Sequence, residues 1–461
     1  MTTDHRRYSY WLETVEDDLT PRPPLTGSET VDVAILGAGL TGLWTAYYLL
    51  QHDPSLRVAI VEQQIAGFGA SGRNGGWLSP GFPVSLPELE RRFGQTNTVD
   101  LYNAMVQAVH ESLRVLESEG IDADQEQAGS IRMARGAHQL PSVERAIRTY
   151  DRLGLGEYAQ PLDASELLER VRVTQAIKAM YNPVTANVNP AKMVRGLART
   201  VERLGASIFE QTRVIDYETG DYPRLMTTHG DVRANVVVLA GEGYLSQLSK
   251  ESRTVIPLYS LITLTEPLSD EQMAEIGWDK RYCIGSSRYT VDYLSRTVDN
   301  RIAVGGRGAP YHFGSRISDA FDQHGPTHQM LQRMAREWFP VLEDVQFTHS
   351  WGGPLGMPRD WMPSMGYEPA NGLAWARGYT GQGVATANLS GQILADLISG
   401  RESELTHLPP VNYENRKWEP EPLRWLGIRF VQSGFTELDR RAEQTGRAPT
   451  GRSLAERLGR H

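Results

Sequence analysis

Cysteine is nearly absent from this sequence, since its 461 residues include only Cys283. A single thiol excludes an intramolecular disulfide and a cysteine-rich metal site, and it suits a reducing compartment, so we expect a cytoplasmic protein. The eleven histidines have no spacing typical of metal ligands. The sequence therefore predicts neither a disulfide nor a metal site.

Excess positive charge and long apolar runs are also lacking. The formal net charge of -9 argues against nucleic acid or an anionic membrane as a partner. Residues 31–50 approach the length of a membrane span, but Asp32, the glycines and the helical period of the second half favour a strand, a turn and a helix. The charged N-terminus lacks the apolar core of a signal peptide. We therefore expect no membrane segment, and the length predicts two domains.

A glycine motif follows the first apolar strand. The run VDVAIL predicts a buried parallel strand, and GAGLTG then places Gly37, Gly39 and Gly42 in a G-x-G-x-x-G turn before a helix. A second apolar strand, RVAIVE, ends at Glu62, whose carboxylate suits the adenosine ribose hydroxyls and would repel a 2'-phosphate. This arrangement predicts a dinucleotide site; a purely structural glycine turn is the alternative.

A stretch from 67 to 81, GFGASGRNGGWLSPG, then holds six glycines in fifteen positions. Glycine lowers the propensity for helix and strand, so we expect neither here. A flexible surface loop is one interpretation. The other is a cradle for a flat polar isoalloxazine, whose edge the amides of Ala70 and Ser71 and the side chains of Ser71, Arg73 and Asn74 would line. We favour FAD over NAD because a nicotinamide enzyme would continue with βαβ repeats.

Parallel βαβ pieces recur in the middle and near the end of the chain, with antiparallel material between them. The last piece, RGYTGQGV, starts a helix whose N-terminal amides suit the negative charge of a reduced flavin. We predict an α/β fold in which a Rossmann-like FAD-binding domain is built from discontinuous segments, with an inserted α+β antiparallel-sheet substrate domain. The predicted segments are 28–84, 188–256 and 345–412 for the FAD-binding domain, 85–187 and 257–344 for the substrate domain, and 413–461 for a C-terminal helical extension.

In this order the elements resemble the D-amino-acid oxidase/glycine oxidase superfamily of FAD-dependent amine oxidoreductases, nearest to its γ-glutamylputrescine oxidoreductase-like subgroup. The matching pieces include DVAILGAGLTGLWTAYYL, GASGRNGG, VVVLAGEGYL, WGGPLGMPRDWMPSMG and GYTGQGVATANLSGQILADLI, which span nearly the whole chain. The resemblance implies FAD and oxidation of the C–N bond of a primary or secondary amine. Hydride transfer to flavin N5 would give an imine that hydrolyses to a carbonyl. It also implies that the backbone of Val214 lies against the adenine.

Departures from the related sarcosine oxidases narrow this expectation. Neither the segment that carries their flavin-linking cysteine nor the GASGRNGG region, where other relatives place a histidine, has such a residue, so we expect noncovalent FAD. Ala385 and Ser79 stand where those enzymes have cationic anchors for a small carboxylate, which puts sarcosine and simple α-amino acids in doubt. Ala303 falls near the position of their oxygen-activating lysine. Without that lysine, the sequence leaves two alternatives for the electron acceptor, O2 or another molecule.

Candidate catalytic side chains are aromatic or cationic groups near the expected flavin. An aromatic pocket would orient an amine and hold it by cation–π contact, and an arginine would bind an acidic group of the substrate. We single out Tyr259, Arg307, Trp351 and Tyr379, together with Trp77 and Arg288. Core packing is the alternative for the aromatic residues, and an exposed or ion-paired side chain is the alternative for the arginines.

The predicted cofactor-binding residues follow the three glycine elements and their flanks. They are Gly37, Gly39, Leu40, Thr41, Gly42, Glu62, Gln63, Gly69, Ala70, Ser71, Arg73, Asn74, Gly75, Gly76, Val214, Ala240, Gly241, Gly378, Tyr379, Thr380, Gly381, Gln382, Gly383 and Val384.

Two other functions stay open for such a flavoprotein. A flavin monooxygenase usually has a Gly-Asp motif before the last flavin helix, where this chain has RGYTGQG. A redox-inactive flavoprotein subunit of an assembly is the other alternative, and reduction of the flavin by an amine would separate it from an enzyme. Predicted partners are a small amine and an electron acceptor, with a homo-oligomer as one option.

Overall fold

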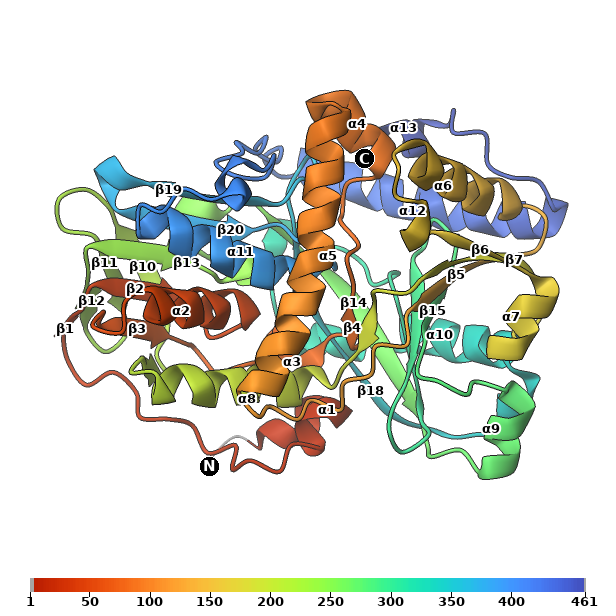
Figure 1. Cartoon of the computed structure of the whole chain (residues 1–461), viewed down its shortest axis with the longest axis horizontal. Coiled ribbons are helices and arrows are strands. Elements are labelled where there is room, and N and C mark those ends of the chain that lie inside the picture. The colour runs from red at the N-terminus through yellow and green to blue at the C-terminus, as the bar shows by residue number, and fades with distance from the viewer. Residues whose placement is uncertain (1–3, 460–461) are drawn as a thin grey trace.

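The computed structural model describes residues 4–459, which form three larger sheets. Figure 1 shows the strands of two of them, a six-stranded and a four-stranded sheet, at one end of the molecule and the eight-stranded sheet at the other, with the long helix α5 (Gln95–Ser118) between them. The six-stranded sheet has the order β19 (Ser364–Glu368), β20 (Leu373–Arg377), β13 (Val236–Leu239), β2 (Val33–Leu36), β3 (Val58–Val61) and β9 (Ser207–Phe209).

Alternate residues of the central strands pack on opposite faces of the six-stranded sheet. Ile35, Ile60 and Val238 belong to the core beneath a helical layer, whereas Ala34 and Ala59 face the four-stranded sheet. All neighbouring pairs are parallel except the edge pair β19–β20. The helical layer consists of α2 (Leu40–His52), α5, α8 (Pro190–Arg203) and α11 (Gly383–Ile398); the four-stranded sheet has the order β1 (Glu29–Thr30), β12 (Asp231–Arg233), β11 (Arg224–Thr227) and β10 (Val214–Glu218).

The six-stranded sheet draws its strands from three separated stretches of the chain, so the predicted α/β fold with a discontinuous Rossmann-like unit is confirmed. The exact segment boundaries that we gave for the two domains and the extension stay predictions.

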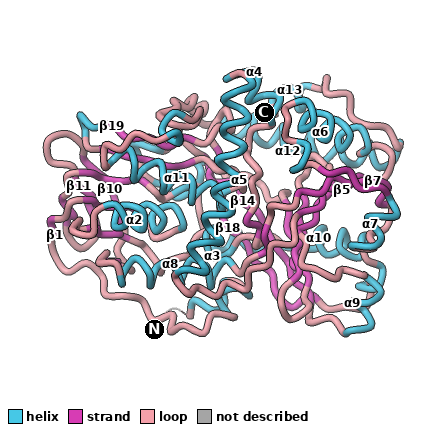
Figure 2. The backbone as a smooth tube through the Cα atoms, viewed as in Figure 1, coloured by secondary structure: helices cyan, strands magenta, loops and turns pink. Residues whose placement is uncertain are grey.

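The eight-stranded sheet carries the second half of the fold (Figure 2, magenta strands at the right). Its pairs are antiparallel, as expected, except that β5 and β15 run parallel. The order is β18 (Phe347–Met357), β14 (Ile256–Thr265), β17 (Ile302–Gly306), β16 (Asp292–Arg296), β15 (Cys283–Ser286), β5 (Ser130–Arg135), β7 (Ala176–Asn182) and β6 (Gln160–Asp163). The accompanying helices are α6 (Leu140–Arg152), α7 (Ala164–Arg170), α9 (Asp270–Ile276) and α10 (Gly325–Trp338).

The glycine-rich stretch 67–81 contains regular structure, so our expectation of neither helix nor strand is wrong. Ala70–Arg73 form the short helix α3, and Trp77–Leu78 form β4, which pairs with β8 (Ala186–Asn187). The side-chain amide of Asn74 donates to the carbonyls of Ala70 at 3.1 Å and of Ser71 at 3.0 Å, which closes the end of the helix. Tertiary pairing and this local cap override the low propensity of glycine.

Two short helices, α1 (Tyr10–Glu13) and α4 (Leu86–Phe93), precede the long α5, and the chain ends with α12 (Leu423–Thr445) and α13 (Leu454–Leu458). No helix within residues 4–459 is long and apolar enough to cross a membrane.

The C-terminal extension is fixed to two loops beside the eight-stranded sheet. Asp439 accepts hydrogen bonds from the backbone amides of Tyr289 at 2.9 Å and of Thr290 at 2.7 Å. Glu421 accepts from the amide of Gly314 at 2.9 Å. The first loop connects β15 to β16, and the second follows β17, so α12 and the turn just before it hold both loops.

Candidate active site

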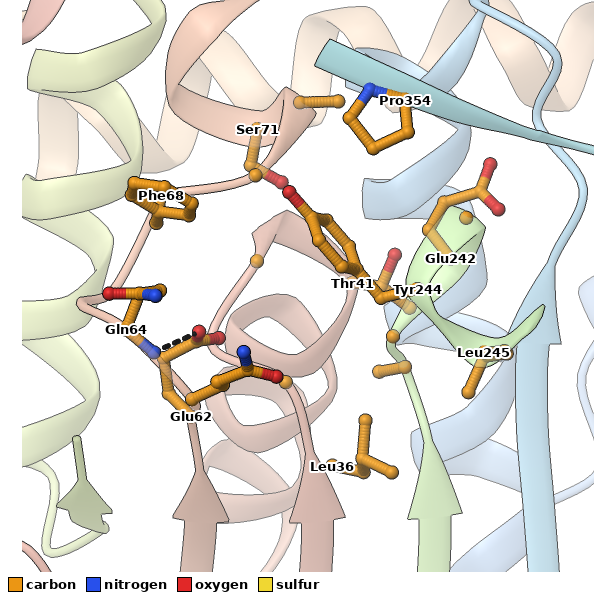
Figure 3. Close-up of a pocket in the computed structure, with 18 of the residues that line it drawn as sticks. Leu36, Thr41, Glu62, Gln64, Phe68, Ser71, Glu242, Tyr244, Leu245 and Pro354 are labelled. Carbon is orange, nitrogen blue, oxygen red and sulfur yellow. Dashed lines mark hydrogen bonds between the residues drawn. The ribbon is translucent and has the colours of Figure 1, made fainter. Parts of the chain in front are cut away.

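A cavity of about 600 Å³ lies at the carboxyl ends of β2, β3 and β13, the edge at which open α/β sheets bind ligands. Figure 3 shows Leu36 and Glu62 on its strand side and Tyr244, Leu245 and Pro354 around it. The predicted cofactor-binding residues that line the cavity are Gly37, Gly39, Leu40, Thr41, Glu62, Gln63, Gly69, Ala70, Ser71, Asn74, Val214, Ala240, Gly241, Tyr379, Gly381, Gly383 and Val384.

The remaining predicted cofactor residues do not line the cavity; they are Gly42, Arg73, Gly75, Gly76, Gly378, Thr380 and Gln382. Gly42 serves the packing of the turn instead, because a Cβ there would lie 2.0 Å from the carbonyl oxygen of Gly37.

The first glycine turn leaves no room for side chains, which allows a ligand to approach its backbone. Gly37 has φ +102°, and a Cβ there would lie 2.9 Å from the carbonyl oxygen of Ala240. The hydroxyl of Ser71 accepts from the amide of Leu40 at 2.9 Å, at the N-terminus of α2. A turn that lines a cavity before a helix N-terminus, with a carboxylate beside it, matches the chemistry of a dinucleotide, so these residues fit FAD.

Glu62 lies at the end of β3 with its carboxylate in the cavity (Figure 3). It accepts hydrogen bonds from the backbone amides of Ala38 at 3.0 Å and Gln64 at 2.9 Å. Burial, partly offset by these amides, raises the pKa of Glu62 to about 6. The carboxylate is therefore held next to the glycine turn with free lone pairs for ribose hydroxyls.

We expect the affinity for FAD to weaken as the pH falls through 6. Ribose hydroxyls donate to the ionised Glu62, so binding favours that form and lowers its pKa below the value of about 6 in the free protein. Below pH 6 binding must release a proton, and the dissociation constant rises by up to about tenfold per pH unit. Above pH 7 it levels off. Titration of the apoprotein with FAD between pH 5 and pH 8, followed by flavin fluorescence, measures this.

The Glu62→Gln variant is the control, because its side chain does not titrate. Its dissociation constant for FAD should be higher than that of the wild type, and it should lose the steep rise below pH 6 that the titration of Glu62 causes. An equal slope in the variant and the wild type would contradict a role for Glu62.

Glu242 is a second cavity carboxylate, which the sequence analysis missed. Its backbone has φ +47°, and its carboxylate accepts from the amides of Gly378 at 3.2 Å and Tyr379 at 2.9 Å. Burial raises the pKa of Glu242 to about 7, and the backbone donors, which include Gly356, oppose this. The sequence does carry a signal for this site, because Glu242 stands between two glycines shortly after the apolar strand β13. Glu242 joins β18 to the loop before α11, and so fixes one wall of the cavity.

Arg73 does not line the cavity but makes a buried ion pair beside it. Its Nη1 lies 2.8 Å from Oδ2 of Asp322, and the two side chains are 1% and 6% exposed. The guanidinium also lies over the Phe68 ring, with Cζ 4.7 Å from its centroid. Burial raises the pKa of Asp322 to about 6, against the opposite effect of Arg73. The pair joins the glycine-rich stretch to the segment just after Ile317–Asp319, which lines the cavity.

The candidate catalytic aromatic residues make internal contacts. The Tyr259 hydroxyl accepts from the amide of Ser318 at 3.0 Å, and its ring packs edge to face against Phe321. Trp351 is buried and donates through Nε1 to the carbonyl of Arg73 at 2.9 Å. Tyr379 lines the cavity, but its hydroxyl lies 2.9 Å from that of Thr41. A substrate contact by any of them stays a prediction.

Tyr293 and Trp77 form an aromatic pair between the glycine-rich stretch and the eight-stranded sheet. Their ring centroids lie 6.4 Å apart, edge to face, and the Tyr293 hydroxyl lies 2.9 Å from that of Ser260. The Trp77 Nε1 is buried without a hydrogen-bond partner among the described residues. Sequence reasoning named Trp77 and missed Tyr293, because no local pattern distinguishes that tyrosine from its neighbours in β16.

The geometry and the comparisons with known proteins define an FAD-dependent oxidoreductase. Residues 32–397 match the family described as DAO, FAD dependent oxidoreductase. The chain belongs to this family.

Three relatives illustrate the similarity. The chain is 30% identical to probable oxidoreductase OrdL of Rhizobium meliloti (strain 1021), over 86% of this chain and 89% of the relative. It is 28% identical to gamma-glutamylputrescine oxidoreductase of Escherichia coli (strain K12), over 89% and 94%. The crystal structure of glycine oxidase from Geobacillus kaustophilus superposes with a TM-score of 0.69 at 24% identity, over 82% and 96%.

Proposed function

We propose that the protein oxidises a C–N bond of a primary or secondary amine with noncovalently bound FAD. One observation carries this proposal: the cavity of the Rossmann-like half is also lined by residues of β18 and of the segment before α10, namely Ile317, Ser318, Asp319, Pro354 and Leu355. A substrate bound between the halves would therefore meet the cofactor. Relatives with this family fold include proteins named for glycine and for gamma-glutamylputrescine, both amines.

The flavin supplies two-electron chemistry when bound, accepting a hydride equivalent from the carbon next to nitrogen. The amine also loses a proton, and water hydrolyses the resulting imine to a carbonyl compound and ammonia or a smaller amine. O2 or another acceptor takes up the two electrons. The protein's own part is to orient the amine, favour its neutral form and exclude water, for which the half-buried aromatic pair of Trp77 and Tyr293 is suited.

Noncovalent attachment is supported by the composition of the cavity wall. Among residues 4–459, no cysteine or histidine lines the cavity. Cys283 is buried in β15, next to the carbonyl of Ala186, and burial raises the pKa of its thiol. It therefore has neither the position nor the thiolate character of a flavin-linking residue.

Positions 385 and 79 supply no cation for a small substrate carboxylate. Ala385 is 1% exposed and packs in the core under α11. The Ser79 hydroxyl accepts from the amide of Gly81 at 3.1 Å. A small amino acid would have to desolvate its carboxylate without these anchors, which is strongly unfavourable.

We expect extended amines to reduce the flavin at least about tenfold more efficiently than sarcosine or glycine, a difference of about 1.4 kcal/mol in transition-state binding. A long amine gains roughly 25 cal/mol for each Å² of apolar surface that it buries. The measurement is the anaerobic rate of flavin reduction divided by the dissociation constant. It compares sarcosine, glycine, a long aliphatic amine and an N-acylated diamine. Better efficiency with sarcosine or glycine would contradict the assignment of positions 79 and 385. Failure of every amine to reduce the flavin would overturn amine oxidation.

A further inference from the structure

Arg307 stands directly after β17, where the strand leaves the eight-stranded sheet. Its backbone amide donates to the carbonyl of Val291 at 3.1 Å, which continues the pairing with the β16 side. Gly308 follows with φ +146°, so the chain turns away there. The backbone of Arg307 is thus fixed by the last hydrogen bond between the β16 and β17 sides of the sheet, and Arg307 does not lie in a free loop.

The guanidinium of Arg307 reaches the glycine turn that precedes α11. Its Nη2 donates to the carbonyl oxygen of Thr380 at 2.9 Å, and its Cζ lies 5.2 Å from the centroid of the Trp361 ring. The same Nη2 lies 3.9 Å from the position that a Cβ of Gly381 would take. Gly381 lines the cavity and Arg307 does not, so the cation lies directly beside the cavity wall.

Arg307 has more donors than the protein uses. Among residues 4–459 its guanidinium makes one hydrogen bond, to Thr380, and no carboxylate lies within 4.0 Å of it. By contrast, the guanidinium of Arg135 donates to two acceptors of Thr174 and to the carbonyl of Glu337. Burial lowers the pKa of Arg307 only to about 10, so it is a cation at neutral pH. A partly buried cation with unused donors favours an anionic ligand.

Arg288, the other arginine considered from the sequence, is already neutralised. Its Nη2 lies 3.1 Å from Oε1 of Glu443, and its Nε lies 3.9 Å from Oδ2 of Asp439. The structure thus separates two residues that the sequence treated alike.

We propose that Arg307 binds a carboxylate that the amine substrate carries at a distance from its reacting C–N bond. The inference rests on the proposed amine oxidation and narrows its substrate class to amino-carboxylates with a spacer between the two groups. A planar guanidinium binds a carboxylate through paired N–H donors, and its contact with the Trp361 ring limits its rotation. The aromatic side chains nearby suit the apolar or amide spacer of such a substrate.

The test compares two probes that differ in one carboxylate. N-glutaryl-1,4-diaminobutane carries it, whereas N-pentanoyl-1,4-diaminobutane has the same acyl chain length without it. For each, the rate of anaerobic flavin reduction over the dissociation constant is measured with the holoenzyme. We expect the wild type to favour the carboxylated probe at least about tenfold, Arg307→Met to reduce this ratio to near one, and Arg307→Lys to keep part of it. Arg288→Met, the matched control, should keep the full ratio.

A binding readout makes the result independent of turnover. N-butylglutaramate has the carboxylate but no amine to oxidise, and calorimetry should detect its binding to the wild type and to Arg288→Met but not to Arg307→Met. FAD content and circular dichroism check that each variant is folded, and Arg307→Gln serves if Arg307→Met is not. An equal probe ratio in the wild type, or an unchanged ratio and unchanged binding in both neutral variants, would overturn the inference. If neither probe reduces the wild-type flavin, amine oxidation fails, while calorimetry still decides whether Arg307 binds the carboxylate.

Discussion

Replacing Glu62 with arginine should weaken FAD binding by at least about 100-fold, which corresponds to about 2.7 kcal/mol. The substitution removes a charged acceptor for the ribose, worth about 1.5–3 kcal/mol per hydrogen bond. It also leaves the amides of Ala38 and Gln64 without their acceptor, which loosens the first glycine turn. The dissociation constant of FAD from the apoprotein, measured by fluorescence titration, reports the effect.

Gln63→Arg provides the matched control for the added cation. Gln63 also lines the cavity but is exposed, so the substitution places the same side chain one residue along without removing an acceptor. We expect its effect to be less than about tenfold, because an exposed charge is screened by solvent. Flavin reduction in FAD-saturated Glu62→Arg should stay within a few-fold of the wild type. Full FAD occupancy with a collapse in reduction rate would show that Glu62 acts elsewhere.

Replacing Asp322 with asparagine should lower the free energy of unfolding by about 3–5 kcal/mol. The variant keeps the shape of the side chain and leaves the Arg73 cation buried without a charged partner. No other carboxylate pairs with Arg73 among residues 4–459, so no alternative ion pair forms without rearrangement. Urea unfolding of the apoprotein measures the change, which should be larger than that of any exposed pair.

The exposed pair Arg440 and Glu437 supplies the comparison, because its atoms lie 2.7 Å apart on the outer surface of α12. Glu437→Gln should leave the free energy of unfolding nearly unchanged, because solvent screens this exposed pair. The double variant Arg73→Met/Asp322→Asn should recover part of the loss, since no unpaired buried charge remains. Similar losses for Asp322→Asn and Glu437→Gln would mean that the Arg73–Asp322 pair is solvated.

The dinucleotide-binding part of the site could be predicted because its residues follow one another closely in the sequence. A strand, three glycines, a helix and an acid at the end of the next strand follow one another within a short stretch, and each step has a steric or electrostatic reason. Gly37 and Glu62 accordingly lie in one cavity. The same holds for the loop before α11, where glycines give way to helical spacing.

The glycine-rich stretch 67–81 shows where propensity fails. Asn74 caps α3, and Trp77 pairs with Asn187, more than a hundred residues later in the chain. Composition predicts what a segment does alone, whereas here a distant strand supplies the missing hydrogen bonds. No sequence pattern in 67–81 predicts that β8 is the pairing partner.

Ion pairing decided the roles of the arginines, and pairing is a property of the folded chain. Arg73 was predicted at a flavin edge, yet Asp322 binds it from a segment some 250 residues away. Arg288 and Arg307 look equivalent in sequence, but only the first meets carboxylates of the C-terminal helix. Which cations stay available for a ligand depends on contacts of this kind, and spacing along the chain does not encode them.

The attachment of the C-terminal extension to two loops has a consequence for the exchange of parts between related proteins. Asp439 fixes the loop that leads into β16, and Glu421 fixes the segment that follows Arg307, so both sides of that arginine depend on residues beyond position 397, where the family match ends. A chimaera that grafts residues 286–315 alone would carry loops without the helix that shapes them. Substrate selectivity should therefore transfer only when the C-terminal extension is grafted together with these loops. Among related proteins, the loops and the extension should also change together.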